Sequence, residues 1–179
     1  ELVIDEKGIY SIEKFLVARR IMYWQVYLHK TIVSAEFLVI NILRKAKELV
    51  SLGEELFCTT SLKIFLTSSF TLNDFKSDTN LLKEFAQLDD YDIFTCVKEW
   101  SKHHNKTLKT LCGMMINRKL YKIEIESNQF GREYINSLRR KTIQQLNIPE
   151  EDAQYFVFSD VIQNNAYNPR KDRISILYK

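Results

Sequence analysis

Residues 15–30 read FLVARRIMYWQVYLHK and place several charged groups inside a segment that otherwise resembles buried core. They belong to a run between Gly8 and Gly53 that contains neither glycine nor proline. A single helix over this run would extend about 60 Å, whereas a compact domain of this size is only about 40 Å across. Either the helix projects and needs a partner to cover it, or it breaks. We favour a break near Thr31–Ser34, where β-branched and small residues cluster, followed by a second helix to about Val50.

The overall composition is that of an ordinary globular protein. Hydrophobic residues make up 45% of the 179-residue chain and charged residues 27%, which allows one domain with a substantial core. The low counts of glycine (4) and proline (2) favour helices over a sandwich or barrel, whose tight turns need these residues. A formal charge of only +3 disfavours an RNA- or DNA-binding fragment, because such proteins concentrate basic residues on one surface.

The three cysteines, Cys58, Cys96 and Cys112, are odd in number and form no CxxC pair. They indicate neither a disulfide framework nor a structural zinc site, so we expect a reducing, cytoplasmic location. The mostly apolar stretch 37–43 is far too short to cross a bilayer, and we expect no membrane partner.

Hydrophobic periodicity predicts the secondary structure of the rest of the chain. Apolar residues at three- and four-residue steps predict helices over 54–66, 72–86, 91–102, 108–118 and 132–146. Strand patterns occur over 2–4, 120–126, 155–162 and 174–178. The sequence therefore predicts one α+β unit over 1–179, mostly α-helical through 11–118 and mixed α/β over 119–179, with a small C-terminal β-sheet.

Short polar residues mark several expected helix starts. Ser11 is the expected N-cap of the first helix, after Gly8 has ended the opening strand. Asp89, Asp90 and Asp92 allow two interpretations, because clustered carboxylates can bind hard cations or can cap a helix and fill its first turn. We favour capping.

Two stripes run along the first helix when its residues are placed 100° apart. One stripe is apolar and is expected to be core: Phe15, Ala18, Met22, Val26 and Val33.

The neighbouring stripe carries Leu16, Arg19, Tyr23, Tyr27 and Lys30. An arginine fork matches phosphate oxygens, and a tyrosine ring can stack on a sugar or base, so this stripe could form one wall of a nucleotide pocket. Arginine and tyrosine also lie at core boundaries and pair with acids there. Periodicity alone favours this second interpretation.

The segment 8–36, GIYSIEKFLVARRIMYWQVYLHKTIVSAE, resembles the region that follows the catalytic core in bacterial HD-domain phosphohydrolases. It is similar to deoxynucleoside triphosphate (dNTP) triphosphohydrolases, including the SAM-and-HD-domain enzyme of animals. The resemblance rests on Gly8, Ile9, Ser11, Ile12, Glu13, Arg19, Met22, Tyr23, Val26, Tyr27, His29 and Lys30. Weaker similarity follows in LDDYDIF (88–94) and NPRKDRISILY (168–178).

The resemblance implies roles for individual residues of the first helix. Arg19 would contact a substrate phosphate, Tyr23 would lie beside it, and Tyr27 would stack near the sugar. His29 and Lys30 would have structural roles or would support the site without contacting the substrate. Tyr23 stands where some relatives have histidine, which leaves its chemical role open.

The resemblance also implies a divalent metal, held by a histidine, a His-Asp doublet and a distant aspartate. This sequence contains no His-Asp doublet. Because the chain also begins at Glu1 rather than at a methionine, we expect a piece of a longer protein whose N-terminal HD core holds the metal. The chain alone is then expected to be inactive. The implied substrate is a nucleotide, specifically a dNTP.

Other polar clusters receive simpler interpretations. His103 and His104 are expected to be exposed or to end a helix, and metal binding there is the less favoured alternative because a site needs further ligands. Arg139, Arg140 and Lys141 are expected to be a solvated face. Arg170, Lys171 and Arg173 could lie near an effector nucleotide, by weaker analogy with regulated relatives.

The alternative function is a non-catalytic module for oligomerisation or regulation. The long first helical run is apolar on most sides and needs burial, which a self-complementary interface could provide. A homo-oligomer is expected on either interpretation.

Overall fold

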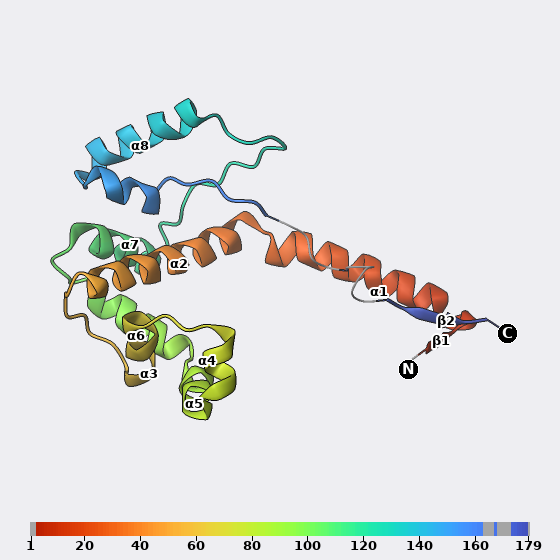
Figure 1. Ribbon diagram of the computed structural model, residues 1–179. Coiled ribbons are helices and arrows are strands. Elements are labelled where there is room, and N and C mark those ends of the chain that lie inside the picture. The colour runs from red at the N-terminus through yellow and green to blue at the C-terminus, as the bar shows by residue number, and fades with distance from the viewer. Residues whose placement is uncertain (1–2, 163–166, 168–172, 179) are drawn as a thin grey trace. The chain divides into compact units, whose positions relative to one another are not determined.

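The computed structural model describes residues 3–162, 167 and 173–178. Most of these residues are helical, and the chain divides into two compact units. Unit 1 comprises Glu1–Val33 and Asp160–Lys179, and unit 2 comprises Ser34–Ser159. Figure 1 shows a mostly helical chain with one small sheet, which confirms the predicted fold class at this level.

Unit 1 pairs the beginning of the chain with its end. Strand β1 (Val3–Asp5) lies parallel to strand β2 (Ser175–Leu177), with Val3 opposite Ser175. The first and last predicted strands are therefore confirmed. The sheet is not purely C-terminal, because one of its two strands comes from the other end of the sequence.

Gly8 allows the first helix to start directly beside β1. It ends a 3-10 turn, η1 (Glu6–Gly8), and helix α1 (Ile9–Met22) follows at once. A Cβ atom at Gly8 would lie 2.9 Å from the Ile4 side chain, so any larger residue here would force that side chain to shift. The prediction that Ser11 caps the helix was wrong, since Gly8 occupies the N-cap position.

The first helical run does break, although a few residues earlier than expected. Helix α1 continues into a π-helical turn, η2 (Tyr23–Tyr27), in which the Leu28 N–H donates to the Tyr23 carbonyl oxygen at 2.8 Å. Helix α2 (Lys30–Ser51) then begins. The break lies at residues 28–29, so the widened turn and not the β-branched cluster ends the first helix.

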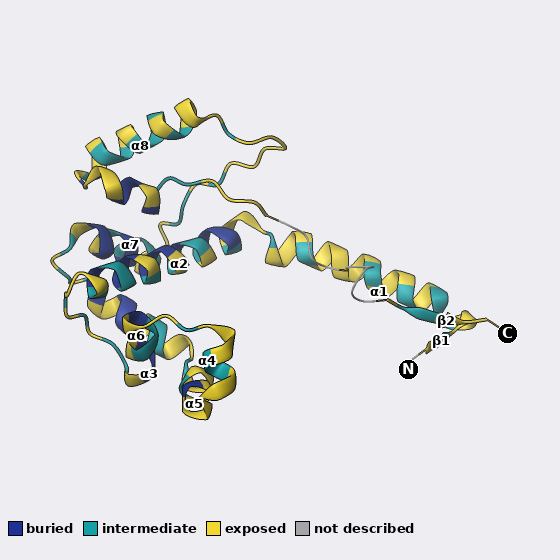
Figure 2. Ribbon diagram, viewed as in Figure 1, coloured by how far each residue is buried: buried dark blue, intermediate teal, exposed yellow. Residues whose placement is uncertain are grey.

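Unit 2 is built from most of α2 and a series of shorter helices. These are α3 (Thr60–Thr67), α4 (Leu72–Ser77), α5 (Thr79–Gln87), α6 (Asp90–Trp100), α7 (Lys106–Ile116), α8 (Arg132–Leu146) and the 3-10 helix η3 (Glu150–Tyr155). The core forms where one face of α2 meets α6 and α7, and its buried side chains include Leu38, Ile42, Ala46, Leu49, Val97, Trp100, Leu108 and Leu111. Figure 2 shows this buried stripe along α2.

Side chains fix the ends of several helices in unit 2. The Asp89 carboxylate accepts hydrogen bonds from the backbone N–H groups of Tyr91 and Asp92, and the Asp92 carboxylate accepts one from the Asp89 N–H. The capping interpretation of this acidic cluster is therefore confirmed. Asp78 caps α5 in the same way, which divides the predicted helix 72–86 in two.

A hydrogen bond from the Trp100 side chain joins the segment before α3 to α6. The indole N–H of this buried tryptophan donates to the Phe57 carbonyl oxygen at 2.8 Å. Gly53, with φ of +90°, turns the chain sharply after α2. Residues 54–59 are consequently irregular, and the predicted helix begins only at Thr60.

Two predicted strands, 120–126 and 155–162, are not strands. Their aromatic residues pack together against α2: Phe158 lies 5.2 Å from Phe37 and 5.4 Å from Tyr121, measured between ring centroids. The Ser34 hydroxyl also donates to the Tyr121 carbonyl oxygen at 3.0 Å. The alternating apolar pattern of these two segments therefore reflects side chains that pack on α2. A strand and an irregular segment can both place alternate side chains on a helix.

A buried ion pair joins α2 to η3. The Lys45 ammonium lies 2.7 Å from one Asp152 oxygen, and both side chains are about 95% buried, with 5% and 4% exposure. The other Asp152 oxygen accepts the Thr107 hydroxyl at 2.5 Å. Lys45 also lies 2.9 Å from Glu48, whose second oxygen accepts the Tyr155 hydroxyl. Three elements of unit 2 therefore meet at one buried polar network.

Within the described residues, no single helix is long and apolar enough to cross a membrane. One interrupted pair, Glu6–Tyr27 followed by Lys30–Ser51, meets the length and composition requirement when taken together.

We predict that Asp152→Ala will destabilise unit 2 by about 3–5 kcal/mol, because it leaves the Lys45 ammonium buried without its main partner. The measurement is urea unfolding followed by circular dichroism. Lys102→Ala is the matched control: it breaks the exposed Lys102–Glu99 pair and should change stability by less than about 1 kcal/mol. Equal effects of the two variants would contradict a structural role for the buried pair.

The same network predicts that stability falls at acid and at alkaline pH, outside a window from about pH 4.5 to 10.5. Burial alone would raise the pKa of Glu48, but hydrogen bonds from Tyr155 and Lys45 outweigh it and hold this pKa below the ordinary 4.5. Burial alone would lower the pKa of Lys45, but hydrogen bonds to Asp152 and Glu48 raise it above 10.5. The contribution of Glu48 to folding stability is lost as the pH falls below 4.5 and through the depressed pKa. The contribution of Lys45 is lost as the pH rises above 10.5.

This prediction is checked by unfolding free energies measured from acid to alkaline pH. Glu48→Gln should flatten the acid side of the profile, whereas Glu55→Gln, at an exposed position two residues after Gly53, should leave it unchanged. An acid side that keeps its slope in Glu48→Gln would contradict the assignment.

Candidate functional site

The structure brings three of the predicted site residues into contact on unit 1. The Arg19 guanidinium carbon lies 5.6 Å from the centroid of the Tyr23 ring, in a cation–π arrangement. The Tyr23 and Tyr27 rings are 5.0 Å apart between centroids, tilted by 45°. Arg19 is exposed, Tyr23 is half-buried, and Tyr27 is 50% exposed. The three side chains thus form a continuous polar and aromatic surface along α1 and η2.

The π-helical turn sets the geometry of this surface. It contains both tyrosines and adds one residue to the turn, so side chains beyond it are rotated relative to an uninterrupted α-helix. π-turns are frequent at functional sites. An exposed cation–π contact contributes only about 0.5–1 kcal/mol, so the Tyr23 ring orients the guanidinium only weakly.

His29 and Lys30 lie beyond the turn, where α2 begins. The His29 backbone carbonyl accepts from the N–H groups of Ile32 and Val33, and its ring Nδ1 accepts from the Thr31 N–H at 3.3 Å. His29 therefore caps α2, which is a structural role. Lys30 is the exposed first residue of that helix. Their predicted supporting roles at a substrate site stay predictions.

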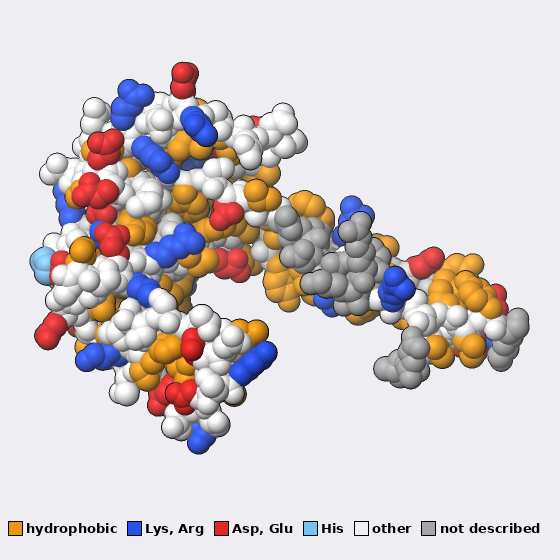
Figure 3. Space-filling view, in the orientation of Figure 1, with side chains coloured by type: hydrophobic (Ala, Val, Ile, Leu, Met, Phe, Trp, Pro, Cys, Tyr) orange, Lys and Arg blue, Asp and Glu red, His pale blue; other side chains and the backbone are white. Residues whose placement is uncertain are grey.

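The apolar stripe predicted to be core is largely exposed in the described part of the chain. Phe15, Met22 and Val26 are 57%, 45% and 47% exposed, Ala18 is also exposed, and only Val33 is buried. Figure 3 shows hydrophobic side chains at the surface along this segment. Helical periodicity located the apolar stripe but does not specify what covers it.

An open groove of about 430 Å³ runs along another face of α1, and none of the predicted substrate residues lines it. Its lining residues are Tyr10, Glu13, Lys14, Val17, Ala18 and Ile21.

The predicted basic clusters have different outcomes. Arg139 is half-buried and donates to the Val157 carbonyl oxygen, so only Arg140 and Lys141 form a solvated face. In the third cluster, Arg170 and Lys171 lie outside the described residues, and Arg173 is exposed.

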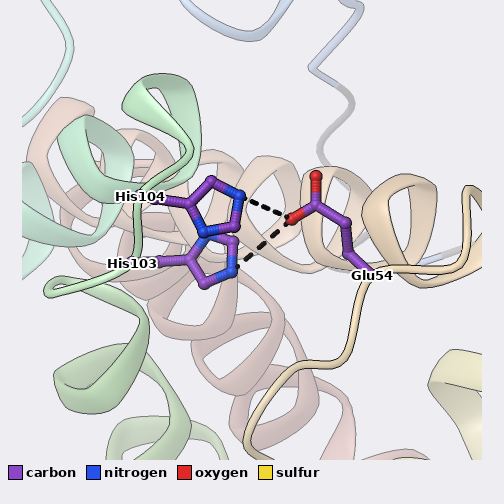
Figure 4. A group of neighbouring side chains, drawn as sticks. All are labelled: Glu54, His103 and His104. Atoms are coloured by element: carbon purple, nitrogen blue, oxygen red, sulfur yellow. Dashed lines mark ion pairs between the residues drawn. The ribbon is translucent and has the colours of Figure 1, made fainter.

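A second group of functional side chains lies in unit 2, away from the polar stripe in sequence. Nε2 of His103 and Nε2 of His104 lie 3.6 Å and 3.2 Å from the same Glu54 oxygen, Oε2 (Figure 4). Glu54 follows α2, and the histidines connect α6 to α7. Sequence reasoning missed Glu54, since about fifty residues separate it from the histidines and no spacing rule links them.

Comparisons with known proteins agree on one relationship. Residues 1–54 match the family model described as the HD associated region. The chain is 47% identical to a phosphohydrolase from Bacteroides thetaiotaomicron, whose crystal structure superposes with a TM-score of 0.89 over 100% of this chain and 44% of that one. It is 30% identical, over 130 residues, to the uncharacterised protein YwfO of Bacillus subtilis, covering 72% of this chain and 28% of YwfO.

These matches support the interpretation of this chain as an HD-domain-associated protein. They relate it to a hydrolase, and they confirm the predicted HD resemblance at this coarser level. The chain spans less than half the length of either relative. The family model ends at Glu54, so it covers α1, η2 and α2, the elements that carry every predicted substrate residue.

Proposed function

We propose that this chain is part of a metal-dependent, HD-type phosphohydrolase that acts on nucleotides, and that the surface formed by Arg19, Tyr23 and Tyr27 contacts the substrate. The observation that carries the proposal is the chain of contacts from the Arg19 guanidinium through the Tyr23 ring to the Tyr27 ring. The 47% identity to a phosphohydrolase supports the same activity class. The proposed substrate is a dNTP.

Each side chain has a role that follows from its chemistry. The Arg19 guanidinium offers a planar set of N–H donors that can bind two phosphate oxygens at once. Tyr23 lies beneath this group and limits its orientations. Tyr27 is half exposed, so its ring can stack on a sugar or base, and its hydroxyl can donate a hydrogen bond.

The metal that HD phosphohydrolases use does not fit the residues of this chain. The sequence has three histidines, and each is followed by lysine, histidine or asparagine, never by aspartate. In this proposal the metal and the water it activates belong to an HD core in the rest of a longer protein. This chain would bind and orient the substrate.

Arg19→Ala in the complete protein should lower kcat/KM for dNTPs by roughly 10- to 100-fold, the value expected when a charge-assisted hydrogen bond is lost. The measurement is steady-state hydrolysis at saturating metal. Arg20→Ala is the matched control, because Arg20 is also exposed but lies 100° around the helix. Arg19→Lys should recover only part of the loss, since lysine cannot bind two oxygens as a fork.

An unchanged kcat/KM in Arg19→Ala would remove Arg19 from the substrate site. Equal losses in Arg19→Ala and Arg20→Ala would indicate a general effect of positive charge rather than a specific contact.

A non-catalytic oligomerisation module is the second candidate, and one observation favours it. Apolar side chains of α1 and η2 are unusually exposed, among them Phe15 (57%), Val17 (58%) and Trp24 (57%). Large apolar side chains exposed along one helix often mark an interface. A second copy of the same chain could cover it through a two-fold interface.

Light scattering over a range of concentrations tests self-association. If α1 forms the interface, the wild-type chain is a dimer or larger, and Val17→Glu shifts it towards monomer. Tyr91→Glu changes an exposed ring, 82% accessible, in unit 2 and should have no effect. A wild-type chain that is monomeric at every concentration would exclude this candidate.

A further inference from the structure

We propose that Glu54, His103 and His104 form a binding site for a divalent transition-metal ion, with Zn²⁺ as the best fit. The three side chains lie in unit 2 and take no part in the substrate surface. They form the one group of three or more His, Cys, Asp or Glu ligand atoms, all within 4.8 Å of one another, found among the residues that the structure describes.

The distances between these ligand atoms fit a metal coordination sphere. Zinc binds histidine nitrogen and carboxylate oxygen at about 2.0–2.2 Å, which places neighbouring tetrahedral ligands roughly 3.3 Å apart. The two nitrogen–oxygen distances here are 3.2 Å and 3.6 Å. Despite this proximity, Glu54 Oε2 is buried and receives no hydrogen bond. A buried carboxylate oxygen without a donor is costly, and a cation at the centre of the group would satisfy it.

Each ligand is held by a well-defined helix end. Gly53, in a left-handed conformation, directs Glu54 back so that its N–H bonds to the Leu49 carbonyl oxygen at 3.0 Å. The His103 N–H bonds to the Trp100 carbonyl oxygen at 3.0 Å, and Asn105 caps α7 just beyond the histidines. Preorganised ligands lose little conformational entropy on binding a metal.

The ligand set selects the class of metal. Two imidazoles and one carboxylate suit zinc, cobalt or nickel, whereas magnesium and calcium prefer oxygen ligands. His104 is 78% exposed, so the remaining coordination position faces water.

Binding has one identifiable cost. His103 Nδ1 accepts the Asn105 N–H at 3.1 Å, whereas coordination through Nε2 requires the proton to lie on Nδ1. Asn105 must therefore release this contact. Glu54 and His104 carry no such cost and are expected to contribute most of the affinity.

The test is isothermal titration of Zn²⁺ into the tag-free chain, dialysed first against a chelator. We expect one equivalent to bind. Glu54→Gln and His104→Ala should each weaken binding by at least tenfold, since even loss of a residue that only supports a metal ligand typically costs about 10- to 100-fold. Zinc should also raise the melting temperature of the wild-type chain, because it binds the folded state, and should not raise that of either variant.

Two controls separate this site from other zinc ligands. Glu55→Gln removes the neighbouring exposed carboxylate, and His29→Ala removes the remaining histidine. Both variants should bind zinc like the wild type. Titration with Co²⁺ should give visible absorption without the charge-transfer band of cysteine ligands, which excludes binding by Cys58.

Folding of the variants is checked by circular dichroism, and His104→Ala alters a side chain too exposed to unfold the chain. Failure of the wild type to bind zinc, or wild-type affinity in both Glu54→Gln and His104→Ala, would overturn the proposal.

Discussion

The buried contact between Lys45 and Asp152 is the constraint on which unit 2 depends. A buried ammonium is strongly unfavourable without a carboxylate partner, so α2 and η3 can pack together only in the register that joins these two side chains. Thr107 extends the same requirement to α7. Apolar side chains such as Ile42 and Leu111 supply most of the driving force for burial, but such contacts tolerate small shifts. The buried ion pair does not tolerate such shifts.

The two ends of the same helical run present different surfaces. Along α2, apolar residues at four-residue steps are buried in the core that α2 shares with α6 and α7. Along α1, equally apolar residues remain accessible, next to a surface of guanidinium and phenol groups. A helix with this composition is suited to contact another protein surface on one side and a polar ligand on another. Both candidate functions use this property, and they differ in which side matters most.

Sequence reasoning located most helices and failed where tertiary contacts decide local structure. Helix α8 lies where periodicity placed it, and the Asp89 cap was recognisable because short acidic residues at a helix start act locally. The segments around Tyr121 and Phe158 were misassigned, since their alternating side chains pack on α2 instead of on a neighbouring strand. The position of the helix break was also missed, because a π-turn has no distinctive residue pattern.

The candidate sites divide in the same way. Arg19, Tyr23 and Tyr27 follow one another at four-residue steps on one helix, so helical geometry alone predicted their proximity. Glu54 meets His103 and His104 only because α2, α6 and α7 share a core, and that arrangement is set by many distant contacts. Sites within one element can be anticipated from spacing, whereas sites between elements need the fold.

The pairing of β1 with β2 has a consequence for the order of folding. Val3 meets Ser175, so the sheet closes a loop that contains almost the whole chain. Closing so long a loop is entropically unfavourable, and a three-residue ladder returns few hydrogen bonds in exchange. Unit 2 contains its own core and can collapse first, which shortens the effective loop. Unit 1 would then form late and open early, so the N-terminal end of α1 would be the part of the chain that hydrogen exchange reaches soonest.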